Sequence, residues 1–85
     1  MREQTLQALK NYVEHGTAPD AFVEAVLCND LINAVSLADS TNYAGLKDIV
    51  LWITKQAPDA CYGSAAKVNR WINTQANKGG VFQNT

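Results

Sequence analysis

Apolar residues recur every three or four positions along almost the whole chain, and this spacing constrains the fold more than any other feature of the sequence. Such spacing gathers apolar side chains on one face of a helix, whereas a half-buried strand needs strict alternation, which the chain lacks. Short breaks interrupt the pattern at Gly16, at Asn29 and Asp30, and at Ala57 and Pro58. Glycine, asparagine and aspartate favour helix ends, and a proline disfavours the helical conformation of the residue before it. The sequence therefore predicts an all-α fold, a compact bundle of four or five short helices.

The expected helices lie between these breaks. One covers residues 3–15, a second starts with Pro19 in its first turn, a third continues to residue 37, a fourth covers 42–56, and a fifth runs from Ser64, as its cap, to about residue 77. A continuous helix over 19–38 is the alternative to a break at Asn29. Residues 1–78 are expected to form a single domain. Residues 79–85, which begin with two glycines, are expected to be a flexible tail.

The size of the chain limits its stability and favours self-association. A domain of 85 residues buries only about 60–65% of its unfolded surface, and an oligomer would add burial. The N-terminus has no apolar signal segment, and no apolar run approaches the roughly 20 residues that span a bilayer. Cys28 and Cys61 are interpreted as buried thiols. The expected protein is cytoplasmic, with no membrane contact.

Few residues suit catalysis or metal binding. The one histidine, His15, ends a predicted helix, where a ring can cap carbonyl groups or meet the partial negative charge of the helix end. The two cysteines lie far apart without a CxxC motif, which argues against a zinc site within one chain. The sequence has neither a glycine-rich phosphate loop nor an HExxH motif. We therefore expect no enzymatic activity, no metal and no cofactor.

The helix over 42–56 is apolar on more than one face. Leu51 and Trp52 lie outside its main apolar stripe, on the same side as Lys47, Asp48 and Lys55. A helix of this kind is either central in its fold or part of an interface. Leu51 and Trp52 are therefore candidate oligomer contacts, and burial in the core is the alternative.

Charge is distributed unevenly along the chain. Residues 1–43 carry two basic and six acidic side chains, a balance of −4, whereas residues 44–85 carry five basic and two acidic ones, a balance of +3. No acidic residue follows Asp59. The positive end is therefore the place to expect an anionic ligand. Duplex DNA is not expected, because so few cations on an acidic body give little electrostatic attraction.

The start of the last helix has features of an anion site. If Ser64 caps the helix, the N–H groups of Ala65, Ala66 and Lys67 are free to bind a phosphate, aided by the helix dipole. Lys67, Arg70, Thr74 and Lys78 form a basic stripe, and aromatic rings beside it would suit a base. The candidate ligand-binding residues are Tyr62, Gly63, Ser64, Lys67, Arg70 and Trp71. The alternative is structural: Trp71 in the core, the cations on a solvated face and Ser64 an ordinary cap.

Several short segments are distinctive when they are taken together. They are Tyr12 to Gly16, Pro19 with Phe22, Ala25 to Leu27, Asn29 to Leu31, Ala38 and Asp39 with Asn42, Ile49 and Val50 with Trp52, Ala57 and Pro58, Cys61 to Ser64, and Val68 with Trp71 and Ile72. Over residues 12–72 the sequence resembles short all-helical proteins of phages and prophages. This group has no assigned activity, so no site residue is carried over.

The resemblance implies a setting, because small non-enzymatic phage proteins often interfere with a host system. The expected function is to counteract a host defence by sequestering a small anionic nucleotide signal in a homo-oligomer. The first alternative is a protein–protein inhibitor of a host defence or regulatory protein, which would need an exposed hot spot. The second is an assembly or structural factor of the virion.

Overall fold

The computed structural model describes the backbone of residues 1–80 and the side chains of residues 1–75. The described residues form six α-helices and one 3₁₀ turn and contain no strand, which confirms the all-α prediction. The elements are α1 (Glu3–His15), α2 (Ala21–Leu27), α3 (Leu31–Leu37), α4 (Ser40–Ala44), α5 (Leu46–Gln56), η1 (Asp59–Cys61) and α6 (Ala65–Gly80).

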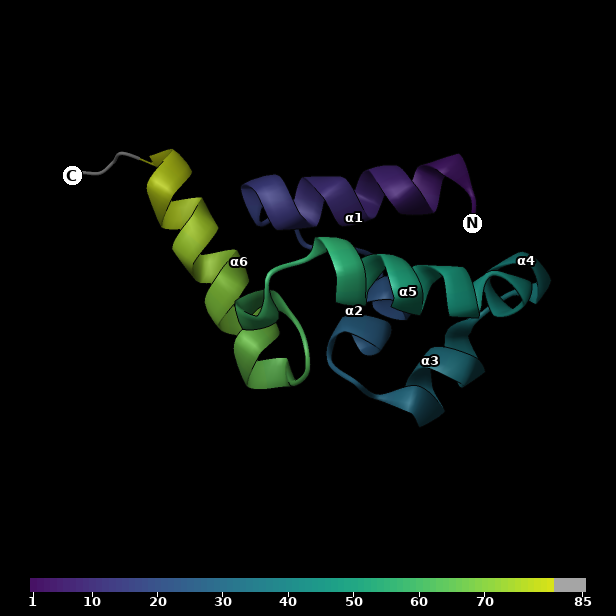
Figure 1. The fold of residues 1–85 in the computed structure, drawn as a ribbon. Coiled ribbons are helices and arrows are strands. Elements are labelled where there is room, and N and C mark those ends of the chain that lie inside the picture. Colours follow the sequence, from purple (N-terminus) through teal and green to yellow (C-terminus); the bar gives the residue numbers. More distant parts are fainter. Residues whose placement is uncertain (81–85) are drawn as a thin grey trace.

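Helices α1 and α5 lie side by side, and α6 crosses the ends of both (Figure 1). Helix α2 packs beneath them, and α3 lies at the lower edge of the molecule, farthest from α1. The core is where α1, α2, α5, η1 and α6 meet. Its largest fully buried side chains are Tyr12, Leu9, Leu27, Ile49, Val23, Val68 and Cys61.

The predicted end of α1 and the break between α2 and α3 are both confirmed. Gly16 follows α1 with φ of 69°, the left-handed conformation that ends many helices. Asn29 adopts φ of 62° after α2. Its N–H donates to Val26 O, and the N–H of Asp30 donates to Ala25 O, the bond pattern of a Schellman motif. Asp30 then caps α3, so the continuous helix over 19–38 is not formed.

Two observed helix starts differ by two residues from the predicted ones, because the aspartate immediately before each helix acts as its cap. Asp20 accepts from the N–H of Val23 at 2.9 Å, so α2 starts at Ala21 and Pro19 precedes it. Asp39 accepts from the N–H of Asn42 at 2.8 Å, so α4 starts at Ser40. An oxygen at this position satisfies an amide that lacks a partner within the helix.

Two further helix boundaries also differ from the prediction. The helix expected over 42–56 is divided at Gly45, which has φ of −94° and ends α4 just before α5 begins. Helix α6 continues through Gly79 and Gly80. The rest of the predicted flexible tail, residues 81–85, lies outside the described residues.

Candidate binding surfaces

The start of α6 forms as predicted, but its amides are less free than expected. Ser64 Oγ accepts from the N–H of Lys67 at 3.2 Å, and Ser64 O accepts from the N–H of Val68. The cap therefore occupies one of the three N–H groups that we assigned to an anion. Those of Ala65 and Ala66 are left at this helix end.

An acidic residue, Asp59, lies beside the predicted ligand-binding residues. Lys67 Nζ donates to the main-chain carbonyl of Asp59 at 3.4 Å, and the Tyr62 hydroxyl donates to the Asp59 carboxylate at 3.3 Å. Partial desolvation and the Asp59 carboxylate both raise the pKa of Tyr62. The Asp59 carboxylate therefore weakens the positive potential at the start of α6. The sequence after Asp59 has no acidic residue, so it did not reveal this effect.

Gly63 joins α2 to α6 through its backbone. Its N–H donates to Leu27 O at 2.7 Å, and its φ of 115° requires glycine. The Lys67 side chain lies over it, with Nζ 3.7 Å from where a Cβ would be. The positive φ, rather than this contact, explains the glycine on structural grounds alone.

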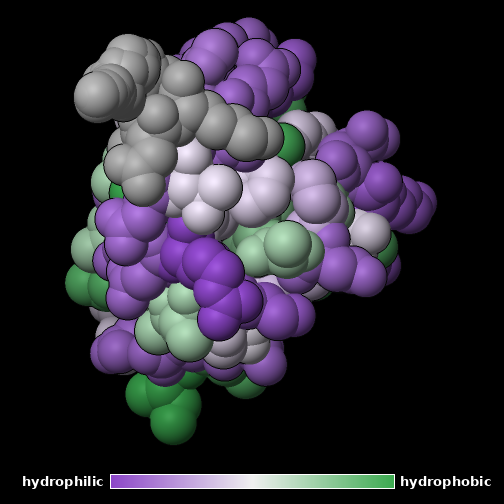
Figure 2. Space-filling model, turned by 90° about the vertical axis from the view of Figure 1, so that its left-hand side faces the viewer, coloured by the Kyte–Doolittle hydropathy of each residue, from purple (hydrophilic) through white to green (hydrophobic). Residues whose placement is uncertain are grey.

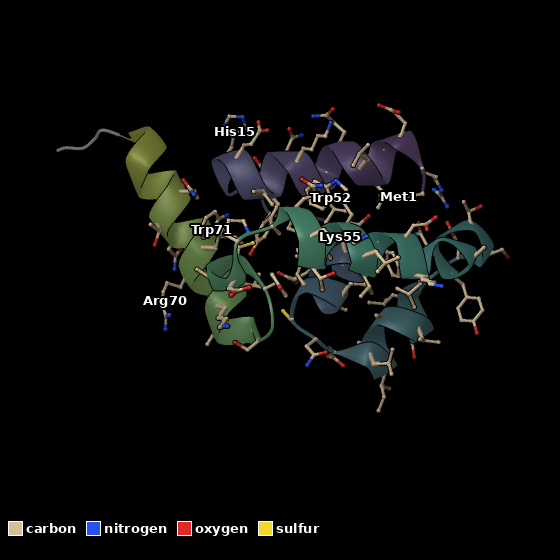
Figure 3. The ribbon with its side chains drawn as sticks, viewed as in Figure 1. Met1, His15, Trp52, Lys55, Arg70 and Trp71 are labelled. Atoms are coloured by element: carbon tan, nitrogen blue, oxygen red, sulfur yellow. The ribbon has the colours of Figure 1, made fainter. Side chains whose placement is uncertain are left out.

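The two remaining candidates of this group face different ways. Trp71 is half-buried, and its indole N–H donates to Tyr12 O at 3.0 Å. It therefore holds α6 against α1, as in the structural alternative. Arg70 is exposed and extends away from the body of the protein (Figure 3). Of the stripe, the side chain of Lys78 lies outside the described residues.

The two candidate oligomer contacts also separate. Trp52 lies between α5 and α1 (Figure 3) and packs against the core while lining an open cleft of about 250 Å³. Lys10, Val13, Glu14 and Gln56 complete the lining of this α1–α5 cleft. Leu51 is 40% exposed. Trp52 thus combines a core role with a place in a surface cleft.

Among the described residues, four of the large apolar side chains that are exposed lie on α3, for which the sequence predicted a helix and no special role. Of its seven residues only Ala34 is buried. Leu31, Ile32, Val35 and Leu37 are between 42% and 80% exposed. Figure 2 shows hydrophobic residues protruding at the lower edge of the molecule, where α3 lies. The signal in the sequence was a helix of seven residues with no charged side chain.

A hollow runs beside α3. A cavity of about 270 Å³ is lined by Val26, Val50 and Ile53 among others, and a smaller one of about 80 Å³ by Val26, Val50 and Leu31 among others. Because the two cavities share residues, they form one groove between α5 and the α2–α3 pair. We call α3 and this groove the α3 face.

The single histidine and the two cysteines of the chain were the other candidates for chemistry. His15 is exposed, with Nε2 3.8 Å from Glu14 Oε1. Cys28 and Cys61 are free thiols, and burial raises the pKa of each. The described residues contain no cluster of three or more potential metal ligands. None of the described helices is both long and apolar enough to cross a bilayer.

Comparison of the chain with protein-family models, with curated proteins and with solved structures finds no match.

Proposed function

We propose that this protein is a non-enzymatic binding protein that acts by contacting another protein through the α1–α5 cleft. The observation that carries the proposal is the position of Trp52, half-buried in a cleft of about 250 Å³ whose rim includes Lys10, Glu14 and Gln56. Tryptophan is enriched among the residues that dominate binding energy. An apolar centre with a charged rim is the usual anatomy of an interface between separately folded proteins.

The resemblance to short phage proteins suggests the kind of target. We propose that it is a cytoplasmic protein of the bacterial host that belongs to a defence or regulatory system. Binding would block a surface that this target needs. Because the rim of the cleft carries one basic and one acidic side chain about a helical turn apart, the partner should present the opposite pair.

Charge reversal at the rim tests this proposal without disturbing the core. Lys10 and Glu14 are both exposed, so the double variant Lys10→Glu, Glu14→Lys should keep the stability of the wild type. A host protein captured by the wild type is identified by mass spectrometry and purified. Its Kd should rise at least tenfold for the double variant. Lys47→Glu, a reversal on an exposed residue outside this rim, is the matched control.

Two results would contradict the protein-binding proposal. One is capture of the same target with equal affinity by the wild type and the double variant. The other is that every host protein captured by the wild type is captured by the double variant as well.

Sequestration of an anionic nucleotide remains a second candidate, supported by one observation. Lys67 and Arg70 lie three residues apart on α6, both exposed, so they can reach one phosphate group together. Against this, Trp71 is engaged with α1 and Asp59 lies next to Lys67. The geometry therefore favours the protein target.

A thermal-shift panel separates the two candidates. Cyclic di- and trinucleotides, ADP-ribose derivatives and plain nucleotides are each added to the purified protein. A ligand at 100 times its Kd stabilises by about 2.7 kcal/mol, which moves the midpoint of a domain this small by roughly ten degrees or more. The shift should disappear in Lys67→Ala and persist in the control Lys47→Ala. No shift with any compound would remove the nucleotide candidate.

A further inference from the structure

Helix α3 exposes far more apolar surface than its packing requires. It contacts mainly α2, and Ile32 and Leu31 are 80% and 67% exposed. Isolated exposed apolar side chains are common, but several on one short helix beside an apolar groove mark an interaction surface. The question is what covers it.

The shape of the α3 face suits a copy of itself. Ile32 and Leu31 protrude from α3, and the groove lined by Val26, Val50 and Ile53 lies directly beside them. A twofold axis places the same patch on both partners, so a projection on one copy must meet a hollow on the other. A face that carries both a projection and a hollow meets this condition without help from another surface.

The charges point to the same partner. Helix α3 has no charged residue, and the whole chain carries a net charge of −1. Among the described residues, Asp30 is the one charged residue that lines the groove, and its carboxylate accepts from Asn33 of the same chain. Two copies would therefore meet without strong repulsion. Homodimer interfaces are more apolar than those between separately folded partners. The α1–α5 cleft, with Lys10 and Glu14 at its rim, is of the second kind. The α3 face is of the first kind.

An interface of ordinary size would cover a small part of the chain. A standard interface buries ~800 Å² on each partner, about one sixth of the 5115 Å² that the chain exposes. The α3 face extends over α3 and over parts of α2 and α5. Burial there would also supply stability that a chain of this size lacks by itself.

We infer that the α3 face is the interface of a homodimer with twofold symmetry, in which α3 of each copy lies against the groove of the other. This inference goes beyond the proposed function, because it concerns a different surface. It leaves the α1–α5 cleft of each copy open, so the dimer would present two docking sites. It also moves the predicted oligomer contact from Leu51 and Trp52 to α3.

Sedimentation velocity on single-residue variants tests the inference. The wild type should sediment as a dimer of 18.6 kDa, twice the 9.3 kDa of one chain. Ile32→Asp should raise the dimer Kd at least a hundredfold, because the symmetry places two carboxylates in the interface. The side chain is 80% exposed, so the helical circular dichroism should not change. Leu31→Ser is a second, milder variant.

The matched control is Leu51→Asp, which places the same charge on an exposed apolar residue of α5 and should leave the dimer intact. The inference would be overturned if the wild type stayed monomeric at 100 times the protein concentration used to measure host-protein binding. It would also be overturned by a dimer that persists in Ile32→Asp. A monomer that still captures a host protein through Lys10 and Glu14 would overturn the dimer alone. A dimer that captures no host protein would overturn the proposed function alone.

Discussion

The corner where α1 meets α6 and the helix α3 use apolar residues in opposite ways. At the corner, Tyr12 is fully buried, its hydroxyl donates to Cys61 O at 2.6 Å, and its own carbonyl accepts from both Gly16 and Trp71. On α3, only Ala34 is buried and the larger apolar side chains face outward. Both regions have helical spacing in the sequence, but one is fixed by contacts within the chain and the other is left for a partner.

This contrast indicates what each region contributes. The corner joins residues up to 59 positions apart through buried and half-buried hydrogen bonds. Together with the buried core beside it, it should contribute far more than α3 to the free energy of unfolding of a single chain. Helix α3 should contribute little to that free energy and much to association. The predictions below test this division by making similar changes in different parts of the molecule.

The largest difference is expected between two isoleucine truncations. Ile53 is 3% exposed and Ile32 is 80% exposed. Ile53→Ala should lower the free energy of unfolding by about 2–5 kcal/mol, because it leaves a cavity in the core. Ile32→Ala should change it by less than about 0.5 kcal/mol in a sample dilute enough to be monomeric. Urea unfolding followed by circular dichroism measures both, and equal losses would contradict the division.

A smaller difference is expected between two tyrosines. Tyr12→Phe removes the donor to Cys61 O and leaves a buried carbonyl without that partner, which should cost about 1–3 kcal/mol. Tyr43 is 63% exposed, so Tyr43→Phe should be almost neutral. If Tyr12→Phe proves as neutral as Tyr43→Phe, the buried hydroxyl does not fix the corner.

Glycine substitutions test how closely α1 approaches α6. A Cβ on Gly16 would meet the Gln75 Cβ at 2.5 Å, and the φ of 69° disfavours any side chain. Gly16→Ala should therefore cost at least about 1 kcal/mol. At Gly45, where φ is −94° and the nearest atoms lie 3.5 Å away, Gly45→Ala should be neutral or slightly stabilising. Thermal midpoints of the two variants, compared with the wild type, give the answer.

The smallest effect concerns pH and the start of α4. The Arg2 guanidinium and the amide of Asn42 lower the pKa of Asp39, so the ionised carboxylate stabilises the fold above the ordinary aspartate pKa of about 3.9. That contribution should disappear as the pH falls below about 4 and through the lowered value. Asp39→Asn should therefore be less stable than the wild type at pH 7, with a gap that closes in acid. A gap independent of pH would contradict this assignment.

Local signals in the sequence predicted much of the fold. Three helix ends depend only on the backbone preferences of the residues at those positions, and all three are observed: the end of α1 at Gly16, the break at Asn29 and the stop before Pro58. The starts of α2 and α4 were missed because a neighbouring aspartate also caps well. Competing caps differ by too little energy for the sequence alone to choose between them.

The surfaces were harder to predict, because they depend on contacts between distant residues. The pairing of Trp71 with Tyr12 O and the approach of Lys67 to Asp59 O arise only when the chain is folded. The apolar spacing of α3 resembles that of a buried helix, and only the packing shows that α5 leaves it uncovered. An apolar pattern predicts that a helix face is buried, but it does not say whether the same chain or another one buries it.

Hydrogen exchange followed by mass spectrometry, at protein concentrations from nanomolar to well above micromolar, is the most direct test of the contrast between the two regions. We predict that the amides of α3 become more slowly exchanging as the concentration rises, while those of α1 and of the first turns of α6 keep the same protection relative to one another. Amides of α3 that are protected equally at every concentration, and as strongly as those of α1, would contradict the account.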